Sequence, residues 1–235
     1  MPRALYLEDS YLKEFDAEVV SVKDEKFVVL DNTGFYPTSG GQPFDTGKMI
    51  CDGKEYPVVF VGKFDGAISH QVEGAGLKAG DKVHCVIDWD RRYKLMRMHT
   101  AAHIFMQVLH NDCGALGTGN ELGVDESRID FSLDNYDPEQ MQAYIAHANE
   151  VIAQDLPVSV DFKTREEAMQ IPGITKLAKG LPEHIQDVRI VSIGDFDVQA
   201  DGGTHVHSTK EVGKIVFVKA KNKGKGRKRA YFRVD

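Results

Sequence analysis

Apolar and polar positions alternate over short segments in the first part of the chain. Four such segments, each typical of a half-buried strand, lie at residues 17–22, 26–30, 58–61 and 82–87. Turn signals such as Asp52-Gly53 fall between them. Regular short strands without a helical pattern are typical of a small β-barrel. We therefore expect residues 1–88 to form a β-barrel domain.

The pattern changes after residue 88, where apolar residues recur every three or four positions. Over residues 91–111 this spacing predicts a long helix, with Asp90 as its N-cap and Gly114 at its end. The apolar positions that carry the pattern are Leu95, Met98, Ala102, Phe105, Met106 and Leu109.

Further helices and strands are expected in the remainder of the chain. A helix over residues 138–154 has Asp137 as its cap, Pro138 in its first turn and Gln140 to complete a capping box. A short third helix is expected to begin at Thr164. Strands are expected at residues 158–162, 188–193, 196–200, 214–219 and 230–234. The predicted fold class is α+β, an N-terminal small β-barrel followed by a helix-on-antiparallel-sheet domain over residues 89–235.

Composition narrows the class of protein. A length of 235 residues suits two domains, and 42% hydrophobic residues can form two cores. There is no apolar run of 18 residues and no apolar segment like that of a signal peptide near the N-terminus. We expect a soluble, cytoplasmic protein without a membrane partner. The three scattered cysteines, Cys51, Cys85 and Cys113, argue against a disulfide framework and against an all-cysteine zinc site.

Positive charge is concentrated near the C-terminus. The net charge is −7, and it becomes −14 when the seven Lys and Arg residues of positions 219–229 are left out. This basic strip contains no acidic residue, and the glycines of KNKGKGRK favour a flexible loop. One interpretation is a solvated hairpin loop. The other is a surface that contacts phosphates, because clustered Lys and Arg displace counterions from nucleic acids.

Two histidines on the predicted long helix suggest a metal site. His99 and His103 are four residues apart, so both imidazoles can reach one ion. Zinc peptidases need a Glu after the first His, and Thr100 stands there. The zinc deaminase signature is also absent. Such a pair by itself is also compatible with two ordinary half-buried histidines.

A second segment about a hundred residues later strengthens the metal hypothesis. Asp201-Gly202-Gly203-Thr204-His205 offers two more ligands, and the glycines permit a tight turn. Imidazole and carboxylate together suit zinc, although the carboxylate shifts the preference toward harder ions. His207 would face the same side as His205 in an extended strand, and it is an alternative to Asp201. Asp201-Gly202 is otherwise explained as a simple hairpin turn.

The motifs taken together resemble one family, the free-standing alanyl-tRNA editing proteins, which are similar to the editing domain of alanyl-tRNA synthetase. The resemblance covers essentially the whole chain in order and matches the medium-length form, a β-barrel plus a zinc editing domain. The segments that carry it are TGFYPTSGGQP (33–43), RMHTAAH (97–103), SRIDF (127–131), GGTHV (202–206) and GKGR (224–227).

The resemblance implies a ligand set and a reaction. The family binds zinc through H-x-x-x-H and C-x-x-x-H, which places one Zn²⁺ per chain on His99, His103 and His205. Asp201 stands where the family has cysteine, so the fourth ligand is Asp201, His207 or water. The implied reaction is metal-dependent hydrolysis of the aminoacyl ester of tRNA(Ala) mischarged with serine or glycine. No stable protein partner is expected.

The resemblance also implies roles for residues outside the metal set. Thr33 and Gln42 are the expected catalytic residues, and Thr33 would bond the serine hydroxyl. Gly40 and Gly41 would allow close approach of the RNA acceptor end, and the positive residues Lys223, Lys225 and Arg227 would bind tRNA. The alternative is that residues 33–41 form turns only.

Two other functions share features with this sequence. Gly-Gly-Gln also occurs in peptide release factors, but there it sits in a basic loop. Here it is flanked by Pro37 and Asp45 with no cluster of Lys or Arg, which argues against that function. A non-catalytic, metal-stabilised tRNA-binding module is the remaining alternative.

Overall fold

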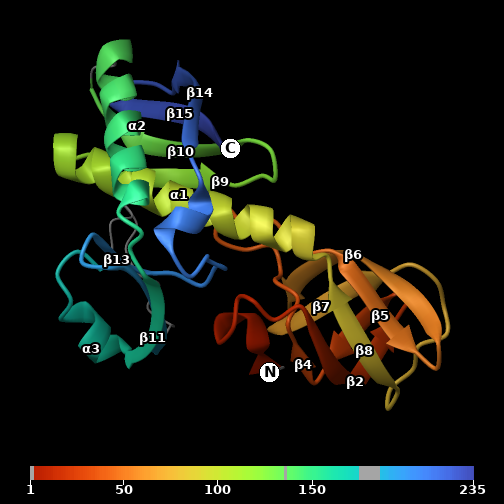
Figure 1. Ribbon diagram of the computed structural model, residues 1–235. Coiled ribbons are helices and arrows are strands. Elements are labelled where there is room, and N and C mark those ends of the chain that lie inside the picture. Colours follow the sequence, from red (N-terminus) through yellow and green to blue (C-terminus); the bar gives the residue numbers. More distant parts are fainter. Residues whose placement is uncertain (1–2, 135–136, 175–185) are drawn as a thin grey trace. The chain divides into compact units, whose positions relative to one another are not determined.

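The computed structural model describes residues 3–134, 137–174 and 186–235 (Figure 1). The chain divides into two compact units, Met1–Lys94 and Leu95–Asp235. This division falls inside the long helix α1 (Trp89–Cys113). The domain boundary between residues 88 and 89 stays a prediction.

The first unit contains a closed barrel with strand order β2-β3-β7-β6-β5-β8. Its strands are β2 (Glu14–Lys23), β3 (Phe27–Leu30), β5 (Gly47–Cys51), β6 (Lys54–Phe64), β7 (Ala67–Val72) and β8 (Lys82–Ile87). The expected barrel is confirmed. Strands β5 and β7 have no counterpart among the expected strands. The reason in β7 is His70, a fully buried histidine that interrupts the alternation of apolar residues between Ile68 and Val72.

Two short parallel strands and one buried ion pair stabilise the segment before β5. The pair is β1 (Arg3–Ala4) with β4 (Asn32–Thr33), and a 3₁₀ turn, η1 (Leu5–Leu7), follows β1. Arg92, near the start of α1, is fully buried and donates from Nε to both carboxylate oxygens of Asp45 at 3.0 Å. It also donates to the carbonyl oxygens of Ser10 at 2.9 Å and Gly34 at 2.6 Å. Buried charges are tolerated only when paired in this way.

The second unit is built on two antiparallel sheets, which confirms the α+β class. One sheet has the order β14-β15-β10-β9 and the other β11-β12-β13. Their strands are β9 (Gly117–Glu121), β10 (Ser127–Ser132), β11 (Val158–Thr164), β12 (Asp187–Ile193), β13 (Asp197–Ala200), β14 (Ile215–Asn222) and β15 (Arg227–Val234). The remaining elements are α2 (Pro138–Ala153), α3 (Arg165–Met169) and η2 (Thr209–Val212).

The helix α1 runs beside the larger sheet (Figure 1) and contacts it through buried aromatic side chains. The rings of Phe105 and Phe232 meet edge to face, 5.9 Å between centroids. Asp88, rather than the expected Asp90, caps this helix, because its carboxylate accepts from the amide of Arg91 at 3.2 Å. Two aspartates two residues apart both suit a helix start, and apolar spacing alone cannot choose between them. Gly114 ends the helix as expected, with φ of +69°.

The caps of the other two helices follow the sequence closely. The carboxylate of Asp137 accepts from the amide of Glu139 at 2.9 Å, which confirms Asp137 as the cap. The capping box expected with Gln140 is wrong, because the carboxylate bonds the second amide of the helix rather than the third. Thr164 and Glu167 form a complete capping box at the start of α3. None of the described helices is both long and apolar enough to span a membrane.

The basic strip is a β-hairpin rather than a long loop. Strand β14 reaches Asn222 and β15 begins at Arg227, so only residues 223–226 form the connection. The glycines therefore mark a tight turn, with φ of +113° at Gly224 and +67° at Gly226. Some lysines of the expected loop lie in the strands and others in the turn. Lysine at every second position is compatible with a strand, because alternate side chains share one exposed face.

Candidate metal centre

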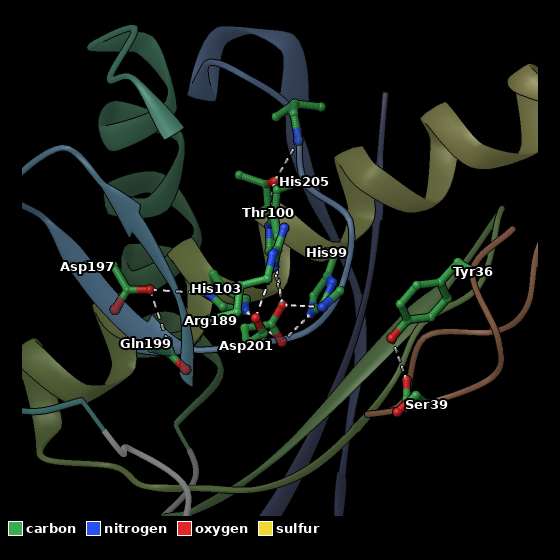
Figure 2. A network of polar contacts seen from close by, with 12 residues as sticks. Tyr36, Ser39, His99, Thr100, His103, Arg189, Asp197, Gln199, Asp201 and His205 are labelled. Carbon is green, nitrogen blue, oxygen red and sulfur yellow. Dashed lines mark hydrogen bonds and ion pairs between the residues drawn. The ribbon is translucent and has the colours of Figure 1, made fainter. Parts of the chain in front are cut away.

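Four side chains of the second unit converge on one point (Figure 2). His99 and His103 come from α1, one turn apart, and their ring centroids are 5.0 Å apart. Asp201 and His205 follow strand β13. One potential ligand atom from each of these four residues lies within 4.8 Å of every other. The structure therefore brings together the four metal ligands expected from the sequence.

The geometry of the cluster fits a single metal ion. The carboxylate oxygens of Asp201 lie 3.0 Å from Nε2 of His205, 3.6 Å from Nε2 of His99 and 4.0 Å from Nε2 of His103. Ligands of a tetrahedral zinc ion with bonds near 2.0–2.1 Å are about 3.3 Å from one another. The donor set, three imidazoles and one carboxylate, could hold such an ion.

Of the two candidates for the fourth ligand on the chain, Asp201 belongs to the cluster and His207 does not. His207 is exposed, and its backbone amide donates to Glu211 at 3.0 Å. Residues 201–207 are not part of a regular strand, so the alternation that would have placed His207 beside His205 does not apply. The carboxylate of Asp201 also accepts from the amide of Gly203 at 2.6 Å, which fixes its direction.

Outer partners orient two of the imidazoles. Nδ1 of His103 lies 3.3 Å from the buried carboxylate of Asp197, which also accepts from Nε2 of Gln199 at 2.9 Å. Nδ1 of His205 lies 3.1 Å from Oγ1 of Thr100. These contacts occupy Nδ1 and leave Nε2 directed at the cluster, as is usual for metal-binding histidines. Thr100, which stands where a zinc peptidase has Glu, is thus an orienting residue.

Sequence reasoning assigned no role to Asp197 or Arg189. Asp197 is an acidic residue at an inward-facing strand position. That pattern is the one sequence feature that could have indicated a functional role for it. The guanidinium of Arg189 donates to the carbonyl oxygen of Asp201 at 2.9 Å and lies 3.9 Å from its carboxylate. A buried positive charge therefore accompanies the two buried carboxylates.

The surroundings set the protonation of the cluster. Burial lowers the pKa of His205 to about 4 and holds the pKa of His99 well below its ordinary value of 6.5. Burial alone raises the pKa of Asp201, but the charge of His99 and the hydrogen bond from His205 outweigh it and hold that pKa well below 3.8. At neutral pH the imidazoles of His99 and His205 are neutral and the carboxylate of Asp201 is charged, which are the forms that bind metal.

The expected catalytic residues Thr33 and Gln42 lie in the first unit, and both are buried. Oγ1 of Thr33 is 2.9 Å from Nε2 of His70 and accepts from the amide of Phe35 at 3.1 Å. Nδ1 of His70 is 2.9 Å from the carbonyl oxygen of Val28, so Nδ1 carries the proton and Nε2 accepts the hydroxyl of Thr33. Burial lowers the pKa of His70 to about 4, which keeps the ring neutral.

The Gly-Gly segment forms a tight turn. The backbones of Ser39 and Gln42 pair with each other, and Gly40 and Gly41 between them have φ of +58° and +90°. Both glycines are exposed. The turn that the sequence offered as an alternative is therefore present, and its exposed backbone is also accessible to a ligand.

The seven positive side chains of the basic hairpin divide into two groups. Lys228 is buried and donates to the carbonyl oxygen of Asp134 at 3.1 Å, and Arg229 forms a two-bond ion pair with Asp130 at 2.6 and 2.7 Å. The remaining five are exposed: Lys219, Lys221, Lys223, Lys225 and Arg227. Lys219 and Lys221 lie over the ring of Tyr231, 4.7 and 5.6 Å from its centroid.

Comparisons with known proteins place this fold and site in a class. Residues 7–91 match the family described as tRNA synthetases class II (A), and residues 188–231 match the threonyl and alanyl tRNA synthetase second additional domain. Both units thus contain segments related to domains of aminoacyl-tRNA synthetases.

Individual relatives identify the family. The alanyl-tRNA editing protein AlaX-M of Methanosarcina barkeri is 50% identical over 99% of this chain and 98% of its own length. The protein of the same name from Saccharolobus solfataricus is 44% identical over 100% and 99%. The alanine–tRNA ligase of Pyrococcus abyssi is 39% identical over 98% of this chain, which corresponds to 25% of the ligase. The chain belongs to the alanyl-tRNA editing protein family.

Loss of the outer carboxylate should weaken metal binding without dismantling the cluster. We expect Asp197→Asn to lower zinc affinity by about 10–100-fold, because the amide oxygen is a weaker acceptor for Nδ1–H of His103. Competition with a chromophoric chelator measures the affinity. Asp195→Asn, two residues away on the exposed turn, is the matched control. Equal affinities for the two variants would contradict the orienting role of Asp197.

Proposed function

We propose that this protein hydrolyses the aminoacyl ester of tRNA(Ala) mischarged with serine, and also that of tRNA(Ala) mischarged with glycine. Membership of the alanyl-tRNA editing family supports a deacylase activity, which is a hydrolase reaction. The observation that carries the metal dependence is the convergence of His99, His103, Asp201 and His205 within 4.8 Å. Zn²⁺ is the proposed cofactor, one per chain.

The chain's own residues prepare the centre for zinc. Burial holds His99 and His205 neutral. Thr100 directs the ring of His205, and Asp197 directs the ring of His103. When bound, zinc supplies a Lewis acid that lowers the pKa of a coordinated water to about 7 or anchors the substrate. Asp201 is the most exposed of the four, with a fifth of its side chain accessible. It is therefore the ligand nearest to where a substrate or water would compete for the ion.

The selection of serine over alanine is proposed to depend on Thr33. Its hydroxyl proton is directed to His70, so the oxygen can offer only a lone pair to another group. Such an oxygen accepts a hydrogen bond from the serine hydroxyl, whereas the alanine methyl offers none. The interaction free energy of the two substrates would then differ by about 1–3 kcal/mol. Because Thr33 is fully buried, a serine side chain reaches it only if neighbouring atoms move aside. Gln42, also buried, is proposed to act with it.

The tRNA-binding surface is proposed to include the tip of the basic hairpin. Lys223, Lys225 and Arg227 are exposed and are not used in ion pairs with Asp130, unlike Arg229. The exposed backbone of Gly40 and Gly41 is proposed to approach the acceptor end. The alternative function, a metal-stabilised tRNA-binding module without catalysis, rests on the same surface and differs only in the outcome of a hydrolysis assay.

The central test is deacylation of Ser-tRNA(Ala) beside Ala-tRNA(Ala), each with and without a chelator. We expect rapid loss of the seryl ester only, stopped by the chelator and restored by zinc. His103→Ala should abolish hydrolysis and leave tRNA binding intact, because it removes one ligand of the ion. His147→Ala, a half-exposed histidine paired with Asp112 outside the cluster, is the control. Undiminished Ser-tRNA(Ala) with tRNA still bound would favour the non-catalytic module.

The role of Thr33 is tested by Thr33→Val, which keeps the shape and removes the hydroxyl. We expect the ratio of kcat/KM for seryl over alanyl substrate to fall at least tenfold, since about 1.4 kcal/mol corresponds to a factor of ten. Thr46→Val, a threonine of the same unit that donates to Asp88, is the control. A ratio that stays at the wild-type value would remove Thr33 from substrate selection.

The role of the hairpin is tested with the triple variant Lys223→Ala, Lys225→Ala and Arg227→Ala. We expect weaker tRNA binding and a shallower dependence of log Kd on log salt, by about 0.7–0.9 for each phosphate that the variant no longer neutralises. Lys163, Lys210 and Lys214 are exposed or half-buried lysines elsewhere in the second unit, and their triple alanine variant is the control. If both variants show the wild-type slope, the hairpin is a solvated surface.

A further inference from the structure

A cavity of about 540 Å³ lies in the second unit, where the last turns of α1 face the turn between β12 and β13. Gln107, His110 and Asn111 line it from the helix, and Asp195, Phe196 and Asp197 line it from the turn. Asp197 is shared with the metal centre, because its carboxylate also contacts His103. The cavity therefore lies behind the cluster, with Asp197 as the common wall.

Gln107 is the first indication that the cavity takes a ligand. The residue is 7% exposed, and its Nε2 donates to Oδ1 of Asn111 at 2.8 Å. Its Oε1 is buried and accepts no hydrogen bond from any residue that the structure describes. A buried acceptor left in this state carries a free-energy cost. A ligand that donates an N–H or O–H to this oxygen would recover that cost.

Further acceptors line the cavity, beside the side-chain amide of Asn111, which can also donate. Asp195 and Asp197 contribute carboxylates. Nδ1 of His110 lies 3.1 Å from the carbonyl oxygen of Ala115, so Nδ1 carries the proton and Nε2 offers a lone pair. The described lining contains no Lys or Arg. A phosphate group would be repelled here, whereas amino and hydroxyl groups would find partners.

Size and shape narrow the class of ligand. Sites for small molecules measure roughly 300–1,000 Å³, so the cavity suits a ligand of nucleoside size. Phe196 adds a flat apolar ring, the surface on which bases stack in RNA-binding proteins. A simple ammonium ion or polyamine would use the carboxylates but would leave this ring without a role.

We propose that this cavity binds a nucleoside whose base carries an exocyclic amino group, with Gln107 Oε1 as the acceptor for that group. The ligand is either a free nucleoside or the terminal nucleoside of an RNA 3′ end, and only the second source rests on the proposed function. Phe196 stacks on the base, and the carboxylates of Asp195 and Asp197 accept from the ribose hydroxyls or the amino group.

The test is calorimetric titration of the metal-loaded full chain with adenosine and with inosine, which has a carbonyl in place of the amino group. We expect adenosine to bind at least tenfold more tightly than inosine. Gln107→Leu should reduce adenosine affinity at least tenfold with the metal content unchanged. Gln154→Leu, an exposed glutamine of the same unit, should bind like the wild type.

Several results would overturn the proposal: no adenosine binding up to the limit of its solubility, equal binding of the two nucleosides, a preference for inosine, or unchanged adenosine binding by Gln107→Leu. If Gln107→Leu does not fold, Asp195→Asn on the exposed turn provides the same comparison, because it replaces a carboxylate acceptor with an amide. Unchanged adenosine binding by that variant would likewise overturn the proposal.

Competition with tRNA identifies the source of the nucleoside. Displacement of adenosine by intact tRNA, but not by tRNA lacking its terminal adenosine, supports the RNA 3′ end as the natural ligand. Bound adenosine that neither tRNA displaces supports a free nucleoside. No hydrolysis is measured in these titrations, so a chain that binds adenosine but fails to deacylate Ser-tRNA(Ala) would contradict the proposed function and leave the nucleoside site intact.

Discussion

The second unit depends on the burial of one carboxylate among three imidazoles. A charged Asp201 is costly in a largely buried position, and the neutral rings of His99 and His205 do not balance its charge. Its oxygens lie 3.0 to 4.0 Å from the three Nε2 atoms, and the guanidinium of Arg189 lies 3.9 Å away. A divalent cation at the centre would compensate both Asp201 and the nearby Asp197. The charge of the cluster, like the distances between its ligand atoms, is thus suited to a divalent metal ion.

Both units contain buried histidines in which a neighbouring group contacts Nδ1 and leaves Nε2 available for a second partner. In the second unit Asp197 and Thr100 occupy Nδ1 of His103 and His205, which leaves Nε2 for the cluster. In the barrel the carbonyl oxygen of Val28 occupies Nδ1 of His70, which leaves Nε2 to accept the hydroxyl of Thr33. Burial keeps His70 neutral, and because the carbonyl oxygen of Val28 can only accept, the direction of both hydrogen bonds of this ring is fixed at neutral pH. Burial also keeps His205 neutral.

Positively charged and acceptor groups lie on two different surfaces of the second unit. The exposed lysines of the basic hairpin offer several donors on one surface, which suits a polyanion. The cavity behind the metal centre offers acceptors and no positive residue in its described lining, which suits a ligand rich in N–H and O–H groups. An RNA has both kinds of group, since its phosphates are anionic and its bases and riboses are donors. The two proposed surfaces would therefore suit different parts of one class of ligand.

The barrel, the long helix, the α+β class and the family could all be predicted from the amino-acid sequence, because alternation, helical spacing and the ordered motifs are local properties of the chain. The sequence also placed His99 and His103 on one helical face. It did not find β7, whose inward histidine breaks the apolar alternation, or the strand character of the basic strip, whose exposed lysines resemble a loop.

The contacts between residues that are far apart in the sequence followed only from the tertiary structure. It selected Asp201 over His207 as the fourth member of the cluster, because residues 201–207 leave the regular strand in which alternation would hold. It also placed Asp197 against His103 and Gln107 beside the cavity, where α1 meets residues about ninety positions later. Spacing along the chain fixes neighbours within a helix or strand, whereas the meeting of separate elements depends on how their buried faces pack.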